Sequence, residues 1–135
     1  MKYLKFSALS LFAVITLSFV VVKADDVYIN GITVPKMPNY YTTNTVLLKT
    51  QEFRAQRVLH QKSEDNANGQ TREIEVRTRQ TSTPYTVSAY KQLTYNAWTD
   101  LNSAASLTPA AYKLHIKAVK NLSSTIDFWG AWYAY

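Results

Sequence analysis

The chain has 135 residues, with 15 basic residues, nine acidic residues and two histidines, and it contains no cysteine. This length is enough for one domain with its own core. The missing cysteines exclude disulfides, thiol nucleophiles and thiolate metal sites.

The N-terminus has the order of residues that a secretory signal requires. Two lysines precede an apolar run over residues 6–22, and Val22 and Ala24 occupy positions −3 and −1 of a cleavage site. This order predicts a helical signal peptide over residues 1–24 and a secreted, extracellular protein. An uncleaved membrane anchor is the alternative, because the run reaches the shortest length that spans a bilayer.

The remaining domain, residues 25–135, is mildly basic and rich in tyrosine and tryptophan. Loss of the signal removes three of the 15 basic residues and none of the nine acidic ones, so the net charge falls from +6 to +3. Nucleic-acid-binding domains usually carry a denser basic stripe, and no nucleic-acid partner is expected.

The first half of this domain combines turn signals with an ambiguous segment. Asn30-Gly31 between β-branched residues predicts a hairpin with a type I′ turn. Pro35 and Pro38 predict an extended, non-helical stretch. Residues 45–60 fit either a helix with one apolar face or strands with a bulge. The polar residues 63–70 predict an exposed turn.

The second half contains the clearer strand patterns. Alternation of apolar and polar residues predicts strands over residues 72–79, 85–95, 112–119 and 125–135, with an interruption near Lys91 and a polar connection over residues 102–109. These elements predict a mainly β fold, a small antiparallel β-sandwich in a single domain. The predicted core is Ile74, Val76, Val87, Leu93, Leu114, Ile116, Ile126 and Phe128.

Residues 107–118, Leu-Thr-Pro-Ala-Ala-Tyr-Lys-Leu-His-Ile-Lys-Ala, resemble the entry into strand F of fibronectin type III and immunoglobulin-like sandwiches. In those folds a Leu and a Pro precede a Tyr that begins an alternating strand. The resemblance implies that the Tyr112 hydroxyl bonds back to the loop backbone. The early core Trp of those folds has no counterpart in this chain.

Residues 77–87 and the closing strand resemble parts of small, cysteine-free secreted β proteins of Gram-positive bacteria whose function is unknown. The lactococcin-972-like bacteriocins are a more distant comparison, and this chain lacks their Gly- and Trp-rich mature start. The resemblance implies no functional residue.

Basic side chains are expected on the outward faces of two strands. If the strands over residues 72–79 and 112–119 are neighbours, Arg77, Arg79, Lys113 and Lys117 form a basic patch that could bind a polyanion. The alternative is a solvated sheet face, because Glu73 and Glu75 share that surface.

The closing strand has more aromatic surface than one sandwich face can hide. Exposed aromatic rings there would serve sugar stacking, contact with a lipid surface or homo-oligomer formation. Burial on both sides of a central strand is the alternative. The candidate binding residues in this strand are Trp129, Trp132, Tyr133 and Tyr135.

The titratable residues do not form a recognisable catalytic or metal site. His115 is expected to be an exposed strand residue, and no serine lies in a nucleophile turn. The acidic pair Glu64-Asp65 is expected in a solvated loop and lacks the spacing of a calcium site. We therefore expect neither an enzyme nor a cofactor or metal.

The sequence thus favours a secreted, non-enzymatic binding protein. Candidate partners are a cell-surface polyanion, a glycan, a lipid or a protein. The alternative is a bacteriocin-like or toxin-like protein that acts on the bacterial envelope.

Overall fold

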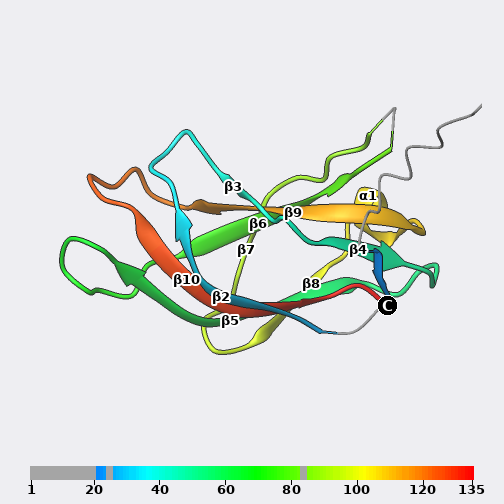
Figure 1. Ribbon diagram of the computed structural model, residues 1–135, viewed down its shortest axis with the longest axis horizontal. Coiled ribbons are helices and arrows are strands. Elements are labelled where there is room, and N and C mark those ends of the chain that lie inside the picture. Colours follow the sequence, from blue (N-terminus) through cyan, green and yellow to red (C-terminus); the bar gives the residue numbers. More distant parts are fainter. Residues whose placement is uncertain (1–20, 24–25, 83–84) are drawn as a thin grey trace, which may run out of the picture.

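The computed structural model describes residues 21–23, 26–82 and 85–135 (Figure 1). Most of the predicted signal peptide therefore lies outside the described residues. Its residues 21–23 form a short strand rather than a helix.

The strands form two sheets that pack face to face as two layers (Figure 1). Sheet A has the order β1 (Val21–Lys23), β4 (Val46–Lys49), β9 (Ala110–Ala118), β6 (Ile74–Gln80) and β7 (Lys91–Gln92), and β3 (Tyr41–Thr42) also pairs with β9. Sheet B has the order β2 (Val27–Val34), β10 (Ile126–Tyr133), β5 (Gln56–Asp65) and β8 (Trp98–Leu101). Helix α1 (Ala104–Leu107) lies between β8 and β9 in the chain.

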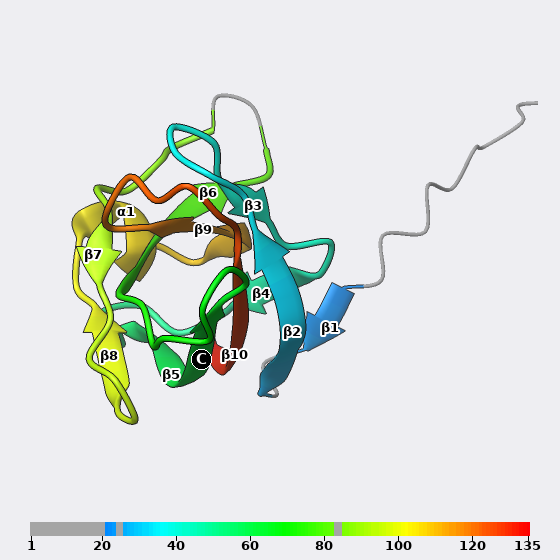
Figure 2. The same cartoon turned by 90° about the vertical axis from the view of Figure 1, so that its left-hand side faces the viewer.

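Neighbouring strands are antiparallel except for the parallel pair β1 and β4. Figure 2 shows β7 and β8 at one side of the molecule and β1 and β2 at the other. The architecture confirms the predicted mainly β fold, a small β-sandwich.

The core lies between the sheets and is built from alternate residues of the long strands. Seven of the eight predicted core residues are at most 5 % exposed: Ile74, Val76, Leu93, Leu114, Ile116, Ile126 and Phe128. The eighth, Val87, is 38 % exposed, so its predicted burial was wrong. Val87 pairs with Arg79, and directly paired residues point to the same face. The outward direction of Arg79 therefore places Val87 outside as well.

The segment around Val87 is not the regular strand that residues 85–95 were predicted to form. Only Lys91 and Gln92 form a strand, β7, which pairs with β6. Residues 86–88 follow the end of β6 through backbone hydrogen bonds from Gln80 to Thr86 and from Ser88 to Thr78. The irregular backbone near Lys91 interrupts the alternation of side chains. Leu93 therefore points into the core although Val87 does not.

Asn30-Gly31 is not a hairpin turn, contrary to the prediction. Strand β2 continues through both residues, and Gly31 has a φ of 60°. Opposite them the register with β10 shifts between Phe128 and Gly130. The positive φ that a type I′ turn would use instead forms a β-bulge, in which glycine is favoured for the same steric reason.

The ambiguous segment over residues 45–60 consists of strands. β4 and β5 are joined by a turn in which Phe53 has a φ of 59° and is 86 % exposed. β5 continues to Asp65, so the predicted exposed turn over residues 63–70 is shorter than expected. Ser63 and Asp65 are buried.

The predicted connection over residues 102–109 contains α1, and β9 begins directly after it at Ala110. The Tyr112 hydroxyl lies 2.6 Å from the Thr108 carbonyl oxygen and 2.8 Å from that of Ala105. Its single proton can be donated to either acceptor, so it ties the start of β9 to the loop before it.

Candidate functional site

The register of β6 and β9 gathers the predicted basic residues on one face. The two strands are antiparallel neighbours, with Arg77 opposite His115, Arg79 opposite Lys113 and Glu75 opposite Lys117. Each of these side chains points away from the core, because Val76, Thr78, Leu114 and Ile116 occupy the alternate, buried positions. The two strands are therefore neighbours, as the predicted basic patch requires.

Charge on this face is graded along the strands. The Lys117 ammonium forms an ion pair of 3.0 Å with Glu75, and Glu73 precedes β6 at the same end. Among the described residues, Arg77, Arg79 and Lys113 have no carboxylate within ion-pair distance. The face is thus locally neutral at Lys117 and cationic from Arg77 to Lys113.

Three tyrosines from loops cover this cationic face. The guanidinium carbon of Arg79 lies 4.0 Å from the centre of the Tyr85 ring, and that of Arg77 lies 4.5 Å from Tyr90 and 5.2 Å from Tyr40. Cation–π contacts at such distances hold the cations in place without neutralising them. We define the cationic face as Arg77, Arg79, Lys113, Lys117 and His115 with Tyr40, Tyr85 and Tyr90.

His115 is covered, although the sequence predicted an exposed residue. Tyr40 stacks on its ring at 4.3 Å between centres, and the residue is 1 % exposed. Arg77 Nε donates a hydrogen bond of 3.0 Å to His115 Nδ1, so the neutral ring carries its proton on Nε2. Burial, with Arg77 and Arg79 nearby, lowers the pKa of His115 to about 4. At neutral pH the positive charge of this face therefore comes from its arginines and lysines.

Two buried polar atoms of this face have no hydrogen-bond partner among the described residues. They are Nε2 of His115 and the hydroxyl of Tyr90. Burial is also the main reason why the pKa of Tyr90 is raised. Buried polar groups in folded proteins nearly always have hydrogen-bond partners. This face therefore has more unpaired buried polar atoms than an ordinary sheet surface.

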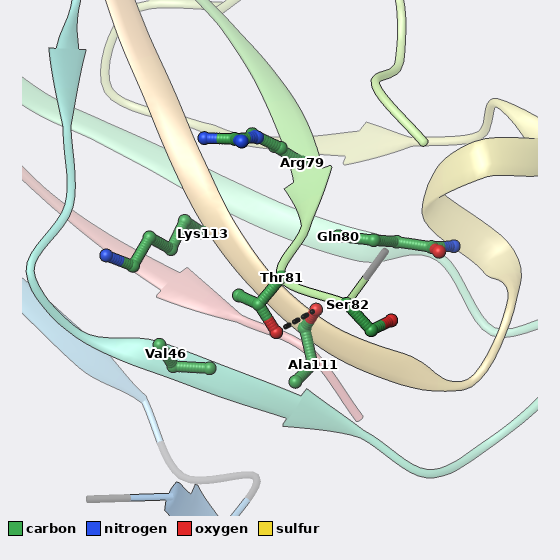
Figure 3. A pocket seen from close by; sticks show the side chains of 7 residues that line it. All are labelled: Val46, Arg79, Gln80, Thr81, Ser82, Ala111 and Lys113. Atoms are coloured by element: carbon green, nitrogen blue, oxygen red, sulfur yellow. Dashed lines mark hydrogen bonds between the residues drawn. The ribbon is translucent and has the colours of Figure 1, made fainter. Parts of the chain in front are cut away.

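A pocket of about 470 Å³ lies at the cationic end of this face (Figure 3). Figure 3 shows the Arg79 and Lys113 side chains extending to the same side, with Gln80 pointing the opposite way. Thr81 Oγ1 donates a 3.3 Å hydrogen bond to the Ala111 carbonyl, and Ser82 adds a second hydroxyl. Val46 of β4 adds an apolar edge. The two cations, set in a largely apolar lining, suit an anionic group.

The predicted aromatic residues lie in the other sheet, and one of them is unavailable. Trp132 is 0 % exposed and its Nε1 donates a 3.1 Å hydrogen bond to Gln56 Oε1 inside the core. Its inclusion among the binding residues was therefore wrong. The alternation that sends Trp129 and Tyr133 outward sends Trp132 inward.

The other three aromatic residues of the closing strand are partly exposed on the outer face of sheet B. Tyr133 and Tyr135 meet edge to face at 4.2 Å, and Arg54 lies 3.6 Å above the Tyr135 ring. The central position of β10 explains why these rings are only partly exposed. The predicted binding residues are thus divided between two opposite faces, cations on sheet A and aromatic rings on sheet B.

A buried histidine–serine pair lies outside the predicted sites. His60 Nε2 lies 3.0 Å from Ser63 Oγ, and Ser63 in turn donates to the Arg72 carbonyl at 2.5 Å. Both residues are at most 1 % exposed, and His60 Nδ1 has no partner among the described residues. The serine hydroxyl is committed to the backbone, so the pair connects β5 to the start of β6.

Asp65 is also buried, which corrects its predicted place in a solvated loop. Hydrogen bonds from Ser124 and from the Ala67 amide lower the pKa of Asp65, and Arg72 forms an ion pair of 2.9 Å with it. Within the described ranges, no group of three or more His, Cys, Asp or Glu residues could hold a metal ion. No described helix is long and apolar enough to cross a membrane.

No sequence pattern predicts that Tyr40, Tyr85 and Tyr90 cover the cationic face, because they lie in loops without periodicity. The only available signal was the recurrence of tyrosine in segments next to the basic strands. Comparison with known proteins finds no matching protein family, no similar curated protein and no similar solved structure.

Proposed function

We propose that this chain is a secreted, non-enzymatic binding protein whose cationic face binds an anionic polymer outside the cell. The observation that carries the proposal is the register that puts Arg79 beside Lys113, next to Arg77, without a carboxylate partner among the described residues. Phosphate, sulfate or carboxylate groups repeated along a polymer would contact these cations one after another.

The pocket beside Arg79 and Lys113 supports a specific contact in addition to general attraction. A charged group that enters it would meet both cations, Arg79 and Lys113. The tyrosines reduce the entropy lost on binding, because the arginines are already held in place. Secretion of the domain remains part of the proposal and rests on the signal predicted over residues 1–24.

Retention of the purified chain on heparin resin and its binding to long-chain polyphosphate test this proposal. The double variant Arg79→Gln with Lys113→Gln should bind about tenfold more weakly, since the loss of about 0.7 kcal/mol at each partly exposed cation sums to about 1.4 kcal/mol. The matched control is Lys36→Gln with Lys120→Gln, which removes the same two charges from exposed positions elsewhere. Equal losses of affinity in the two double variants would show that only the net charge of the protein matters, and this would contradict the proposal.

The same preparations distinguish the bacteriocin-like alternative. Each is added to growing cultures of indicator bacteria, and growth is followed. Inhibition that depends on Arg79 and Lys113 would favour an action on the bacterial envelope. Binding without inhibition would favour a binding protein.

A further inference from the structure

The outer face of sheet B has two bulges at the same level of the sheet. In β2, Asn30 and Gly31 together face Trp129, and in β5 the register with β10 shifts between Trp129 and Gly130, which leaves Gln61 without a partner. A bulge redirects side chains and often lies beside a functional site. Here the two extra residues carry exposed amide side chains on either side of one tryptophan.

A pocket of about 540 Å³ opens over these bulges. This volume lies within the range of about 300–1,000 Å³ that is usual for small-molecule sites. Its lining combines the rings of Trp129 and Tyr95 with polar side chains, among them Asn30, Gln61, Lys62 and Glu64.

The indole of Trp129 is supported from behind by Gly31. A Cβ atom at Gly31 would lie 3.2–3.3 Å from three indole atoms, so the ring rests directly against the glycine. The Lys62 ammonium lies 4.9 Å from the ring centre. Tyr95 is 55 % exposed and adds a second ring from the loop beside β5. The Trp129 ring is thus held against β2, and Tyr95 adds a more exposed ring.

The charge of the pocket is balanced. Lys62 forms an ion pair of 2.7 Å with Glu64, and these are the two charged residues among its lining residues. A lysine already above the indole disfavours a cationic ligand, and the neighbouring carboxylate disfavours an anionic one. This balance contrasts with the cationic pocket of Arg79 and Lys113.

We propose that this pocket binds a pyranose ring of an uncharged glycan. One face of a pyranose presents C–H groups, which suit contact with the Trp129 or Tyr95 ring of the pocket lining, while its rim presents hydroxyl groups that both donate and accept hydrogen bonds. The amides of Asn30 and Gln61 and the Glu64 carboxylate supply partners of both kinds. The site is separate from the cationic face, so the inference does not depend on the proposed binding of an anionic polymer.

The test is binding of the purified chain to an array of uncharged oligosaccharides, followed by indole fluorescence titration with chitotetraose, cellotetraose and maltotetraose. We expect at least one uncharged glycan to bind with a Kd in the millimolar range or tighter, which corresponds to about 4 kcal/mol or more. Trp129→Ala should weaken binding at least tenfold.

Two further variants separate recognition from folding. Asn30→Ala with Gln61→Ala changes exposed side chains only and should also weaken binding at least tenfold. Trp98→Ala is the matched control, because Trp98 is a 37 % exposed indole of the same sheet outside this pocket. Binding that survives the loss of Asn30 and Gln61, or that is lost equally in Trp98→Ala, would overturn the proposal. Absence of any uncharged glycan ligand, or binding of lipid vesicles or sulfated glycans alone, would also overturn it.

Discussion

The outer faces of the two sheets use similar pairs of cations and aromatic rings with different results. On sheet B, Arg57 lies over Trp98 and Lys62 over Trp129, and each cation also has a carboxylate partner, Asp100 or Glu64. On sheet A, Arg77 and Arg79 lie over tyrosines and have no such partner among the described residues. Thus the position of the acidic residues, rather than that of the aromatic ones, decides which face is charged.

The faces also differ in backbone regularity. β6 and β9 pair without a shift along seven residue pairs, whereas β10 has register shifts with both of its neighbours. A regular pair produces a continuous row of side chains, and a bulged pair produces a local hollow. This difference is the reason we propose a long polymer as the ligand of one face and a single sugar ring as the ligand of the other.

Gly130→Ala should have the largest effect, because the bulged face depends on this glycine. A Cβ atom there would lie 2.1 Å from the Leu59 carbonyl oxygen, which belongs to the backbone of β5. We expect a loss of about 3 kcal/mol or more in the free energy of unfolding, measured with denaturant. Gly69→Ala is the control, since its Cβ meets no atom within 4 Å and only its φ of 69° is strained. A loss of unfolding free energy no greater than that of Gly69→Ala would contradict the prediction, because it would show that the backbone of β5 can move away from residue 130.

His115→Phe should change the pH dependence of stability through the cationic face. The folded-state pKa of His115, about 4, lies below its ordinary value of 6.5, so the unfolded chain binds the proton first. Stability is therefore complete above pH 6.5 and falls as the pH drops towards 4, by about 3 kcal/mol for this group. Phenylalanine keeps a ring against Tyr40 but does not titrate, so the variant should lose less.

The measurement is denaturant unfolding of both proteins between pH 7 and pH 4. His60, whose pKa is also lowered by burial, is present in both and cancels in the comparison. Parallel pH profiles would show that folding does not lower the pKa of His115. The assignment of the charge of this face to its arginines and lysines alone would then lose its support.

Gly31→Ala should disturb the pocket around Trp129 with a smaller loss of stability. The new methyl group would press on the Trp129 indole, and the φ of 60° is strained for alanine. We expect a loss of about 1–2 kcal/mol, a shift of indole emission and weaker glycan binding. Heparin retention should stay unchanged. A loss of heparin retention would show that the two faces are coupled.

Salt should weaken polyphosphate binding to the cationic face and leave glycan binding to the outer face of sheet B nearly unchanged. Raising the ionic strength from about 0.1 M to 1 M shortens the Debye length from about 10 Å to about 3 Å. Polyphosphate binding should weaken at least tenfold, while uncharged glycan binding should stay constant within a factor of about two. Isothermal titration at both salt concentrations measures this difference, and a common salt response would remove the distinction between the faces.

The fold could be predicted where alternation was strict, and the prediction failed where the register shifts. Strands β6 and β9 follow a period of two, and their buried and outward residues were assigned correctly apart from the exposure of His115. Val87 was wrong because its face depends on pairing with Arg79, which the local pattern does not encode. Gly31 was wrong because a positive φ is compatible with both a turn and a bulge.

The candidate site could be predicted only in part. The basic residues could be placed on outward faces, and their proximity depended on one pairing of strands. The tyrosines above them and the hollow around Trp129 depend on loops and bulges, which leave no periodic trace in the sequence. Alternation along the closing strand places Trp132 on the buried face. It was nevertheless included among the binding residues because the strand is rich in aromatic residues.

The parallel pairing of β1 with β4 has a consequence for the predicted cleavage of the signal. β1 pairs with residues 46–48, and the cleavage predicted after Ala24 would remove it. The backbone donors and acceptors on that side of β4 would then lose their partners, and β4 would become the new margin of the sheet. Val46 also lines the pocket beside Arg79 and Lys113. Cleavage at the predicted site would therefore expose the edge of a strand next to the pocket of Arg79 and Lys113, so that the chains before and after cleavage would differ in their sheet edges.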